Sequence, residues 1–453
     1  MSDTIAAVAT GWQVCAIGIV RLSGETAIDI ADAVFRPRSG RAMSSYPDRE
    51  LVFGDLVDTD GKTLDVCLCT ISRAPRSYTG EDTAELQCHG SPTVLRAALD
   101  ALFNLGARQA GPGEFTKRAF LNGRMDLVQA EAVADIIEAD TPESAKNAAG
   151  QLGGAIAVKI DAVYARLADV SAHYHAVLDY PDEDIEDFRL EAYRGLFSAS
   201  IDELSALLST FSRGQVLRDG VPAAIIGLPN AGKSSLMNAL LGYDRAIVTD
   251  IPGTTRDTIE EKVRLGGVTL RLMDTAGLRD TGDAIERLGV ERSLEALKCA
   301  QLAIAVVDGG RTASEADAAI IAEASKAPKC VVAVSKLDLG GDYSVCAPEG
   351  VPVVYVSSVT GEGLDELSSA IEELFPLPDV PAGEIITNSR QAEAVSRALI
   401  SMRAAFDAME AGRTPDIVLT ETETAMDALG VLTGRSVGED VTARIFSRFC
   451  VGK

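Results

Sequence analysis

The chain has 453 residues, which corresponds to roughly three domains of about 150 residues each. Its 42 Lys and Arg residues and 67 Asp and Glu residues give a net charge of -25, which excludes a generally basic nucleic-acid coat protein. A content of 47% hydrophobic and 24% charged residues excludes a disordered chain and is typical of a globular protein.

The cysteines and the apolar runs indicate a cellular location. Eight cysteines without a Cys-x-x-Cys pair favour a reducing cytosol over a disulfide scaffold, and Cys67 and Cys69 share one face if they lie on a strand. No apolar run approaches 18 residues, so we expect a soluble, cytoplasmic protein that crosses no membrane. His173 and His175 are two residues apart and would not share a helix face, so we do not expect a histidine metal site.

Residues 1–117 predict a compact α+β domain. Short β-rich runs alternate with turns, and Asp60-Gly61 indicates a hairpin between the last two runs. Ser91 and Pro92 predict the start of a helix that ends before Gly106. The three runs are Val14–Val20, Leu51–Leu56 and Val66–Ile71.

Residues 118–213 predict the first segment of an all-α domain. Apolar residues from Leu127 to Ile137 and from Ile201 to Phe211 recur at helical spacing, and Thr141-Pro142 predicts another helix start. The segment from Ala145 to Leu178 is either one long helix or two, because three glycines interrupt it. We interpret the acidic stretch 179–187 as a solvated connection.

Residues 214–378 predict an α/β domain with a mostly parallel sheet, because short apolar runs alternate there with helix-length segments. Prolines near residue 378 mark a linker, and a sequence pattern typical of helices returns over residues 379–453. We therefore expect the α/β domain to be inserted into the helical domain. The apolar runs are Val221–Gly227, Thr269–Met273, Leu302–Val307, Cys330–Val334 and Val353–Val356.

A phosphate-binding loop follows the first run of this domain. Residues 227–234, GLPNAGKS, match the pattern G-x-x-x-x-G-K-[ST] and open a predicted helix, so backbone N–H groups there can cradle phosphates. Lys233 would reach the β- and γ-phosphates, and Ser234 would hold Mg²⁺. The predicted nucleotide contacts in this loop are Asn230, Ala231, Gly232, Lys233, Ser234 and Ser235.

Two further segments fit a nucleotide switch. Asp274 can orient Mg²⁺ through water, and the N–H of Gly277 can sense a γ-phosphate. Between these motifs lie residues 253–257, GTTRD, in which Thr255 is the predicted second Mg²⁺ ligand. The contacts after the strand are Asp274, Thr275, Ala276 and Gly277.

The selection of guanine is predicted at Ser335-Lys336-Leu337-Asp338. The carboxylate of Asp338 can accept from N1–H and the 2-amino group of guanine, a pair of donors that adenine lacks. Ser335 stands where such motifs usually have Asn, so its shorter side chain predicts weaker guanine binding. Ser357, Ser358 and Val359 would complete the base pocket, and four such motifs in this order predict a Ras-like GTPase domain.

A glutamine that orients the attacking water is missing. Ras-like enzymes place Gln after the Asp-x-x-Gly motif, but this chain has Leu278, which cannot form hydrogen bonds with its side chain. Asn230 could instead help bind a monovalent cation against the phosphates, and Glu286 could orient water. Taken alone, Glu286 fits a carboxylate on a helix surface better than a catalytic residue.

These motifs, together with others, resemble the MnmE (TrmE) family of tRNA-modification GTPases over essentially the whole chain. The stretches outside the phosphate loop carry the resemblance, because ordinary GTPases lack them. They are GIVRLSG at 18–24, YTGED at 78–82, PGEFTKRAFLNGR at 112–124 and FCVGK at 449–453.

The resemblance implies a fold and a chemistry. An N-terminal domain that dimerises would bind a tetrahydrofolate one-carbon donor, 5,10-methylene- or 5-formyl-tetrahydrofolate, and the helical domain would carry an inserted G domain. GTP would be hydrolysed to GDP with Mg²⁺ and K⁺, and Glu286 matches the catalytic glutamate, beside Asn230 and Lys233. The implied folate contacts are Arg21, Glu85, Arg124 and Lys453.

The resemblance also implies partners and a cation site. K⁺ would be held by Asn230 with Thr249, Ile251 and Thr254, and an MnmG-like flavoprotein that uses FAD and NADH would join the homodimer. Together they would add a (carboxymethyl)aminomethyl-type group to C5 of the wobble uridine of tRNAs. The switch-loop contacts to the nucleotide would be Thr249, Asp250, Ile251, Pro252, Gly253, Thr254 and Thr255.

One alternative function and one residue role stay open at this point. A regulatory GTPase that switches between bound states is the rival, and a basic, aromatic RNA-anchoring module would favour it. Aromatic residues are 5% of the chain and no long Lys/Arg run exists, so the sequence predicts no such module. Cys450 is either a reactive thiol near the folate or a small packed side chain.

Overall fold

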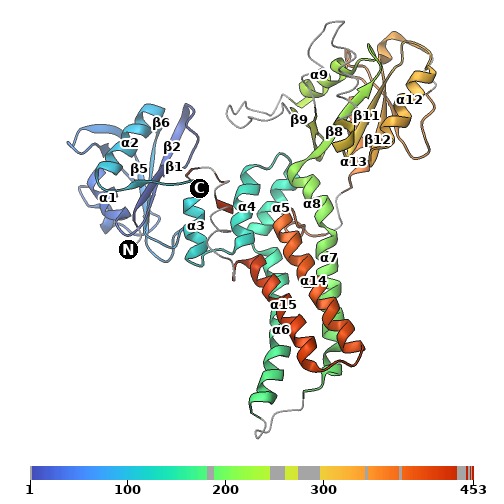
Figure 1. The fold of residues 1–453 in the computed structure, drawn as a ribbon. Coiled ribbons are helices and arrows are strands. Elements are labelled where there is room, and N and C mark those ends of the chain that lie inside the picture. Colours follow the sequence, from blue (N-terminus) through green and yellow to red (C-terminus); the bar gives the residue numbers. More distant parts are fainter. Residues whose placement is uncertain are drawn as a thin grey trace. The chain divides into compact units, whose positions relative to one another are not determined.

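The computed structural model describes residues 3–180, 188–244, 261–273, 296–341, 345–376, 380–435, 445–446, 449 and 451–452. The chain forms two compact units. The first comprises residues 1–134, 151–201 and 397–453, and the second comprises residues 135–150 and 202–396. Figure 1 shows the elements in chain order.

The N-terminal region of the first unit is a seven-stranded sheet with the order β3-β4-β5-β6-β2-β1-β7. Neighbouring strands are antiparallel except β1 and β7, which are parallel. The strands are β1 (Ile5–Val8), β2 (Cys15–Ser23), β3 (Phe35–Pro37), β4 (Val52–Val57), β5 (Thr63–Ser72), β6 (Thr83–Gly90) and β7 (Arg108–Gln109).

Helices α1 (Ala27–Val34) and α2 (Pro92–Asn104) pack on one face of this sheet. Their apolar residues join alternate residues of β5 and β6 in one core, as the period-two pattern of a half-buried strand requires. Three sequence predictions are confirmed here: the β-rich runs, the β4–β5 hairpin with Gly61 at φ 79°, and the helix after Ser91. The side chain of Ser91 makes no capping hydrogen bond.

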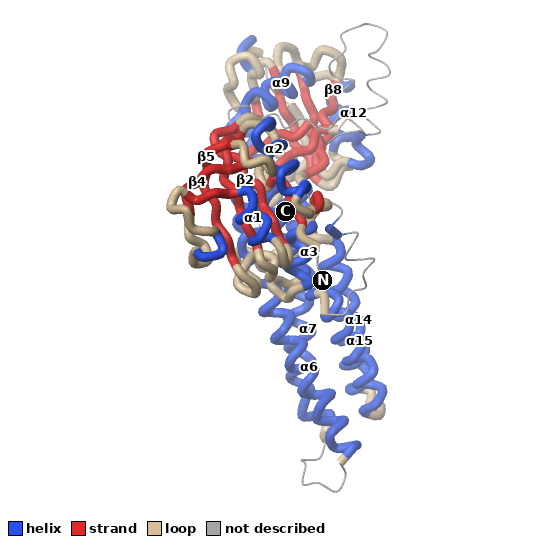
Figure 2. Tube along the Cα trace, turned by 90° about the vertical axis from the view of Figure 1, so that its left-hand side faces the viewer, coloured by secondary structure: helices blue, strands red, loops and turns tan. Residues whose placement is uncertain are grey.

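The first unit also contains helices that were predicted from their apolar spacing. Helices α6 (Ala155–Asp179) and α15 (Pro415–Thr433) lie side by side, which both views show (Figures 1 and 2). Phe446 and Phe449 pack with Leu127 and Val133. The other elements that lie wholly or partly in this unit are η1 (Met43–Ser45), α3 (Glu114–Leu121), α4 (Leu127–Ile137), η2 (Leu190–Tyr193), α7 (Arg194–Ser209) and α14 (Ser389–Glu410).

Breaks between helices answer one open question and correct one prediction. The segment 145–178 belongs to two helices, α5 (Pro142–Leu152) and α6, because Gly154 adopts φ 88° between them. The apolar stripe up to Phe211 also spans two helices, since α7 ends at Ser209 and α8 runs over Phe211–Asp219. Helix α8 reaches Asp219, and the alternation of strands and helices begins after it.

The second unit is built on a six-stranded sheet with the order β13-β12-β11-β8-β10-β9. Five strands are parallel and match the predicted apolar runs, whereas β9 is antiparallel and was not predicted. The strands are β8 (Val221–Gly227), β9 (Glu261–Leu265), β10 (Val268–Leu272), β11 (Leu302–Asp308), β12 (Lys329–Ser335) and β13 (Val353–Tyr355). The helices beside them are α9 (Lys233–Asp244), α12 (Glu315–Ala324), η3 (Leu337–Leu339) and α13 (Leu364–Leu374).

Close backbone contacts join helices of this unit to the segment before α14. Asn147 on α5 accepts from the N–H of Gly383 at 2.9 Å, and its amide donates to the carbonyl of Ile385 at 3.2 Å. A Cβ placed on Gly214 of α8 would lie 1.8 Å from the carbonyl oxygen of Ile386, so that glycine allows the approach. Within the described residues, every helix is too short or too polar to span a membrane.

Candidate functional site

Parallel strands end together at one edge of the six-stranded sheet, and the predicted nucleotide motifs lie at those ends. Gly227 of β8 is opposite Val306 of β11, and Asp308 of β11 is opposite Ser335 of β12. Loops that follow the carboxyl ends of parallel strands form the ligand crevice of such sheets. The register therefore brings residues 227–235, 308–311, 335–339 and 357–359 together.

Two glycines of the phosphate loop allow a close backbone contact and a left-handed backbone conformation. A Cβ at Gly227 would lie 2.5 Å from the carbonyl oxygen of Val306, and Gly232 has φ 95°, so both positions suit glycine. Asn230 has φ 60° and is exposed. The ammonium of Lys233 donates to the carbonyls of Gly227 at 3.0 Å and Leu228 at 2.9 Å, so it lies within the loop. Such a cradle of N–H groups and a cation fits the phosphates of a nucleotide.

Ser335 connects the base-binding segment to the phosphate loop. Its hydroxyl donates to the carbonyl of Ala231 at 2.6 Å and lies 3.1 Å from the carbonyl oxygen of Val307. The residue is 1% exposed, so these contacts are shielded from water. The serine therefore joins two of the strand ends that carry the predicted nucleotide contacts.

The predicted base pocket is held by a second hydroxyl. Ser357 is fully buried, and its Oγ donates to Asp338 at 2.7 Å while accepting weakly from the N–H groups of Val359 and Thr360. The carboxylate of Asp338 is exposed, so its orientation is fixed and it faces solvent where a base could bind.

Lys336 is positioned by an ion pair. Its backbone adopts φ 60°, and its ammonium lies 2.7 Å from Oδ2 of Asp308. Burial alone would raise the pKa of Asp308, but the hydrogen bonds from Lys336 and the N–H of Gly310, with the charges of Lys336 and Arg311, together hold that pKa below its usual range. A charged pair thus flanks the pocket at neutral pH.

Several residues of the predicted site lie outside the described residues. This applies to the catalytic candidate Glu286, to the switch-loop and strand-end contacts, to Leu278, and to the C-terminal Cys450 and Lys453. The switch-loop and strand-end contacts concerned are Thr249, Asp250, Ile251, Pro252, Gly253, Thr254, Thr255, Asp274, Thr275, Ala276 and Gly277.

The predicted folate contacts Arg21 and Glu85 meet on the N-terminal sheet. They are cross-strand partners on β2 and β6, and Nε of Arg21 donates to Glu85 at 2.8 Å. The guanidinium of Arg21 also lies 5.4 Å from the ring centroid of Tyr78 and 5.7 Å from that of Phe115. Phe115 is fully buried but Tyr78 is 38% exposed, so the site combines charge with one accessible aromatic ring, as a ligand with a ring system and carboxylates would need.

The loop from Ser77 to Asp82 places Arg124 at the same site. A Cβ on Gly80 would lie 2.9 Å from Cβ of Asn122 and 3.2 Å from Cγ of Arg124, so the two segments are in close contact. The amide of Asn122 donates to the carbonyl of Thr79 at 2.7 Å. Tyr78 and Gly80 thus bring Arg21 and Arg124 to one loop.

The C-terminal segment reaches this domain too. Val451 forms an isolated bridge with Pro112, and a Cβ on Gly452 would lie 2.2 Å from the carbonyl oxygen of Val8. Val8 is the neighbour of Ala7, which is opposite Arg21 in the sheet. The residue before Lys453 therefore lies close to the strand that carries Arg21.

Sequence reasoning missed the residues that hold the loop. Ser23 lies 2.7 Å from both Thr79 and Glu81, and Arg118 lies 3.0 Å from the carboxylate of Glu81. Arg118 is 8% exposed and also donates to Asp3 and Glu114. All of these residues except Asp3 lie within the sequence stretches that carry the family resemblance. The sequence therefore marked their positions, but residue type alone did not predict their role.

Two of the carboxylates around Arg118, those of Asp3 and Glu114, are held in the ionised form. The hydrogen bond from Arg108 lowers the pKa of Asp3. Burial would raise the pKa of Glu114, but Arg108, the N–H of Gly111 and Arg118 together hold it below its usual range.

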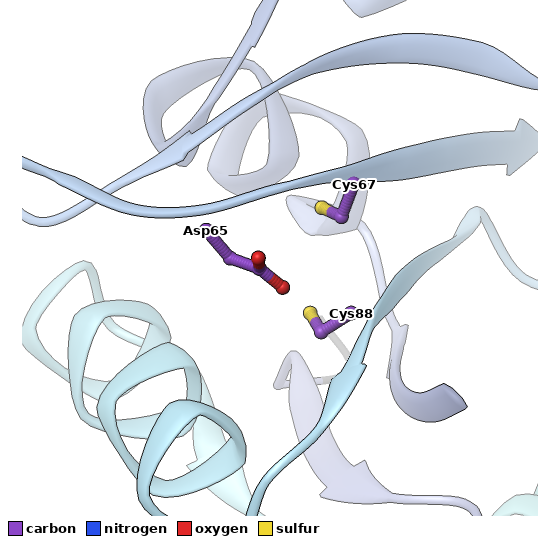
Figure 3. Close-up of side chains that lie close together, drawn as sticks. All are labelled: Asp65, Cys67 and Cys88. Atoms are coloured by element: carbon purple, nitrogen blue, oxygen red, sulfur yellow. The ribbon is translucent and has the colours of Figure 1, made fainter. Parts of the chain in front are cut away.

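One further group of possible metal ligands occurs among the described residues. Figure 3 shows Asp65 and Cys67 of β5 with Cys88 of β6, whose ligand atoms lie within 4.8 Å of one another. The Asp65 carboxylate already accepts from the N–H groups of Val66 and His89 and is bonded to the His89 ring, each at 2.8 Å. A hydrogen bond from Cys67 and burial raise the pKa of Cys88. These contacts assign both thiols to the sheet core.

Comparison with known proteins gives matches over the whole chain. A family model described as the MnmE helical domain matches residues 127–450, and one described as the GTP-binding protein TrmE N-terminus matches residues 4–124. The chain is 42% identical to "tRNA modification GTPase MnmE" of Symbiobacterium thermophilum, covering 100% of this chain and 99% of that protein. It is 39% identical to the protein of the same name from Clostridioides difficile, covering 100% of both.

Proposed function

The chain belongs to the MnmE family of tRNA-modification GTPases, and from this premise we propose that it is a K⁺-activated GTPase acting in the modification of the tRNA wobble uridine. The observation that carries the GTPase assignment is the bond from Ser335 to the phosphate-loop carbonyl of Ala231. It joins the guanine-selecting segment to the phosphate cradle, which a nucleotide must bridge.

The phosphates would be bound by the N–H groups of the loop and by Lys233. Ser234, at the first turn of α9, would hold Mg²⁺, with Thr255 as the second protein ligand, and Asp338 would select guanine. Mg²⁺ and K⁺ supply positive charge against the phosphate oxygens when bound. Lys233→Ala is expected to abolish GTP binding, because it removes the cation that lies inside the loop.

K⁺ would be held by Asn230 with Thr249, Ile251 and Thr254, and Glu286 would orient the attacking water. The experiment is the GTPase rate in KCl against NaCl at equal ionic strength. We expect faster hydrolysis in KCl and loss of that difference in Asn230→Ala. Identical rates in the two salts would refute the cation assignment.

Glu286 has its own test. Glu286→Ala is expected to keep GTP affinity but slow hydrolysis, because the residue acts on water and not on the nucleotide. Glu323→Ala on α12, where Glu323 pairs with Lys326, is the matched control and should hydrolyse GTP normally. Equal turnover in both variants would remove Glu286 from the mechanism.

The N-terminal domain would bind the one-carbon donor, 5,10-methylene- or 5-formyl-tetrahydrofolate. Arg21 and Arg124 would hold its carboxylates, Glu85 would orient Arg21, Tyr78 would supply ring surface, and Lys453 would complete the site. An MnmG-like flavoprotein would provide FAD and NADH chemistry for the transfer to C5 of the uridine.

Each segment of the chain would then have its own role. Residues 1–117 would form the dimerisation and folate domain, and residues 214–378 would form the G domain. Residues 118–213 and 379–453 would together form the helical domain into which the G domain is inserted.

A homodimer would form through the N-terminal domain. The sheet face opposite α1 and α2 presents Ile17 at 59% exposure and Phe53 at 54%, with Ile19, Val66 and Leu68 half-buried between them. An apolar row of this kind on an open sheet face is typical of an interface. Arg21 and Glu85 lie on the same face, so dimerisation and donor binding would share it.

A regulatory GTPase without donor chemistry is the rival function. It needs the nucleotide site of the second unit but gives no reason for the Arg21–Glu85–Tyr78 arrangement in the first. Binding of a reduced folate by the full chain therefore separates the two functions.

A further inference from the structure

The negative charge of the chain is unevenly distributed. Residues 1–124 contain 13 Lys and Arg residues against 15 Asp and Glu residues, a net charge of -2. The remaining residues contain 29 against 52, a net charge of -23. A polyanion is therefore repelled least by the N-terminal domain.

Within that domain the fold gathers arginines that are scattered in the sequence. Residues 36–50 and 73–76 hold six arginines and two acidic residues, Asp48 and Glu50, a net charge of +4. We define the arginine surface as five of these six arginines. They are Arg38, Arg41, Arg49, Arg73 and Arg76.

Contacts among these segments make the surface continuous. Arg73 donates to the carbonyls of Ser44 at 2.6 Å and Tyr46 at 3.3 Å, and the guanidinium of Arg41 lies 4.6 Å from the ring centroid of Tyr46. Arg49 bonds to the carbonyl of Arg76. Two segments that are more than twenty residues apart in the chain thus form one patch.

The outer arginines keep their charge accessible. Arg38, Arg41, Arg49 and Arg76 are exposed. Arg38 is paired with Asp55 at 2.6 Å, and Arg73 is paired with Asp48. Exposed ion pairs contribute little to stability, so a phosphate can replace the carboxylate of Arg38 at small cost.

We propose that the arginine surface binds the phosphate backbone of the tRNA substrate. The planar guanidinium group of arginine can donate two parallel hydrogen bonds to phosphate oxygens. Contacts with phosphates position a nucleic acid without contacting its bases. The surface continues through Arg76 into the loop that carries Tyr78, which contacts Arg21. RNA bound there would place its reacting base near the donor site, so the inference rests on the proposed function.

The experiment measures binding of a fluorescein-labelled tRNA transcript with a wobble uridine to the full chain across a series of KCl concentrations. The variant R38Q/R41Q/R76Q removes three charges without removing a buried contact. We expect roughly tenfold or weaker affinity at low salt and a salt slope lower by about 1 per arginine. The variant R38K/R41K/R76K keeps the charge and should largely keep the slope.

The matched control is R194Q/R403Q/R413Q, three exposed arginines of the helical domain, which changes the net charge equally. It should bind tRNA as the unchanged chain does. GTPase activity should be the same in all variants, and an equal thermal unfolding midpoint reports that the N-terminal domain is correctly folded.

Equal affinity and slope for R38Q/R41Q/R76Q and the unchanged chain would overturn the proposal. It would also be overturned if that variant bound tRNA normally but lost a flavoprotein partner, since the surface would then belong to a protein interface. Absence of tRNA binding by the unchanged chain with normal GTPase activity would overturn the proposed tRNA function as well.

Discussion

Ser335 illustrates how one residue can keep a structural role while changing a ligand contact. The sequence predicts weaker guanine binding because serine stands at the position of an asparagine. The structure adds that the serine hydroxyl still bonds to the carbonyl of Ala231 and is buried. The serine in place of asparagine predicted the weaker contact with guanine. The bond to the phosphate loop depends on strand register and could not be predicted from the residue type.

Substitution of Ser335 should separate these roles. Ser335→Ala leaves a buried carbonyl without its donor, which costs about 1–3 kcal/mol and should weaken GDP binding roughly tenfold. Ser335→Asn should tighten it. The measurement is fluorescence titration with labelled GDP, with Ser325→Ala as control because that hydroxyl bonds within α12. GDP affinity unchanged in Ser335→Ala would contradict the bridging role.

At the scale of an element, the loop from Ser77 to Asp82 depends on the carboxylates around Arg118. The pKa values of Asp3 and Glu114 are lowered in the folded chain, so their contribution to stability is present above the unfolded pKa. It is lost as the pH falls through the folded pKa. The network therefore stabilises the domain at neutral pH and fails in acid.

Glu114→Gln tests this dependence. At pH 7 the variant should melt a few degrees below the unchanged chain, because it loses charged bonds from Arg108 and Arg118. The gap should begin to shrink as the pH falls below the pKa of an unfolded glutamate, about 4.3, and should close as the native carboxylate is protonated at lower pH. Thermal unfolding across pH 3 to 7 measures it, and a gap independent of pH would refute the assignment.

Two helix glycines, Gly214 on α8 and Gly242 on α9, offer a second test at this scale. Gly→Ala in a helix usually stabilises by up to about 1 kcal/mol, and Gly242→Ala should do so because nothing lies within 4 Å of its added Cβ. Gly214→Ala should instead destabilise by about 1–3 kcal/mol, since its Cβ meets the carbonyl of Ile386. Thermal unfolding of the pair should move in opposite directions. A stabilising Gly214→Ala would contradict this prediction, because it would show that the backbone at Ile386 can move away from the added Cβ at little cost.

At the scale of the whole molecule, sequence patterns within a few residues predicted individual strands and helices. Apolar runs and Gly/Pro signals predicted β8, β11, β12 and the helix after Ser91, because period and turn chemistry are encoded within a few residues. Strand β9 escaped prediction, since EKVRL is short and largely polar. The arginine surface escaped it as well, because its members come from two segments that folding joins.

The candidate sites were predictable to different depths. The residue spacing of the phosphate loop was enough to predict phosphate binding. Arg21 and Glu85, in contrast, were identified through family resemblance alone. Their contact depends on pairing of β2 with β6, and the supporting roles of Tyr78 and Arg118 depend on loop packing. Such long-range contacts leave no periodic trace in one sequence.

We propose that one chain combines a GTP site with a one-carbon donor site, and calorimetric binding of 5-formyl-tetrahydrofolate tests this combination. We expect binding by the full chain, loss of that binding in Arg21→Met, and retention in Arg96→Met, an exposed arginine on α2, with GDP affinity equal in all three. No heat of binding from the unchanged chain, or equal folate affinity in Arg21→Met, would contradict it.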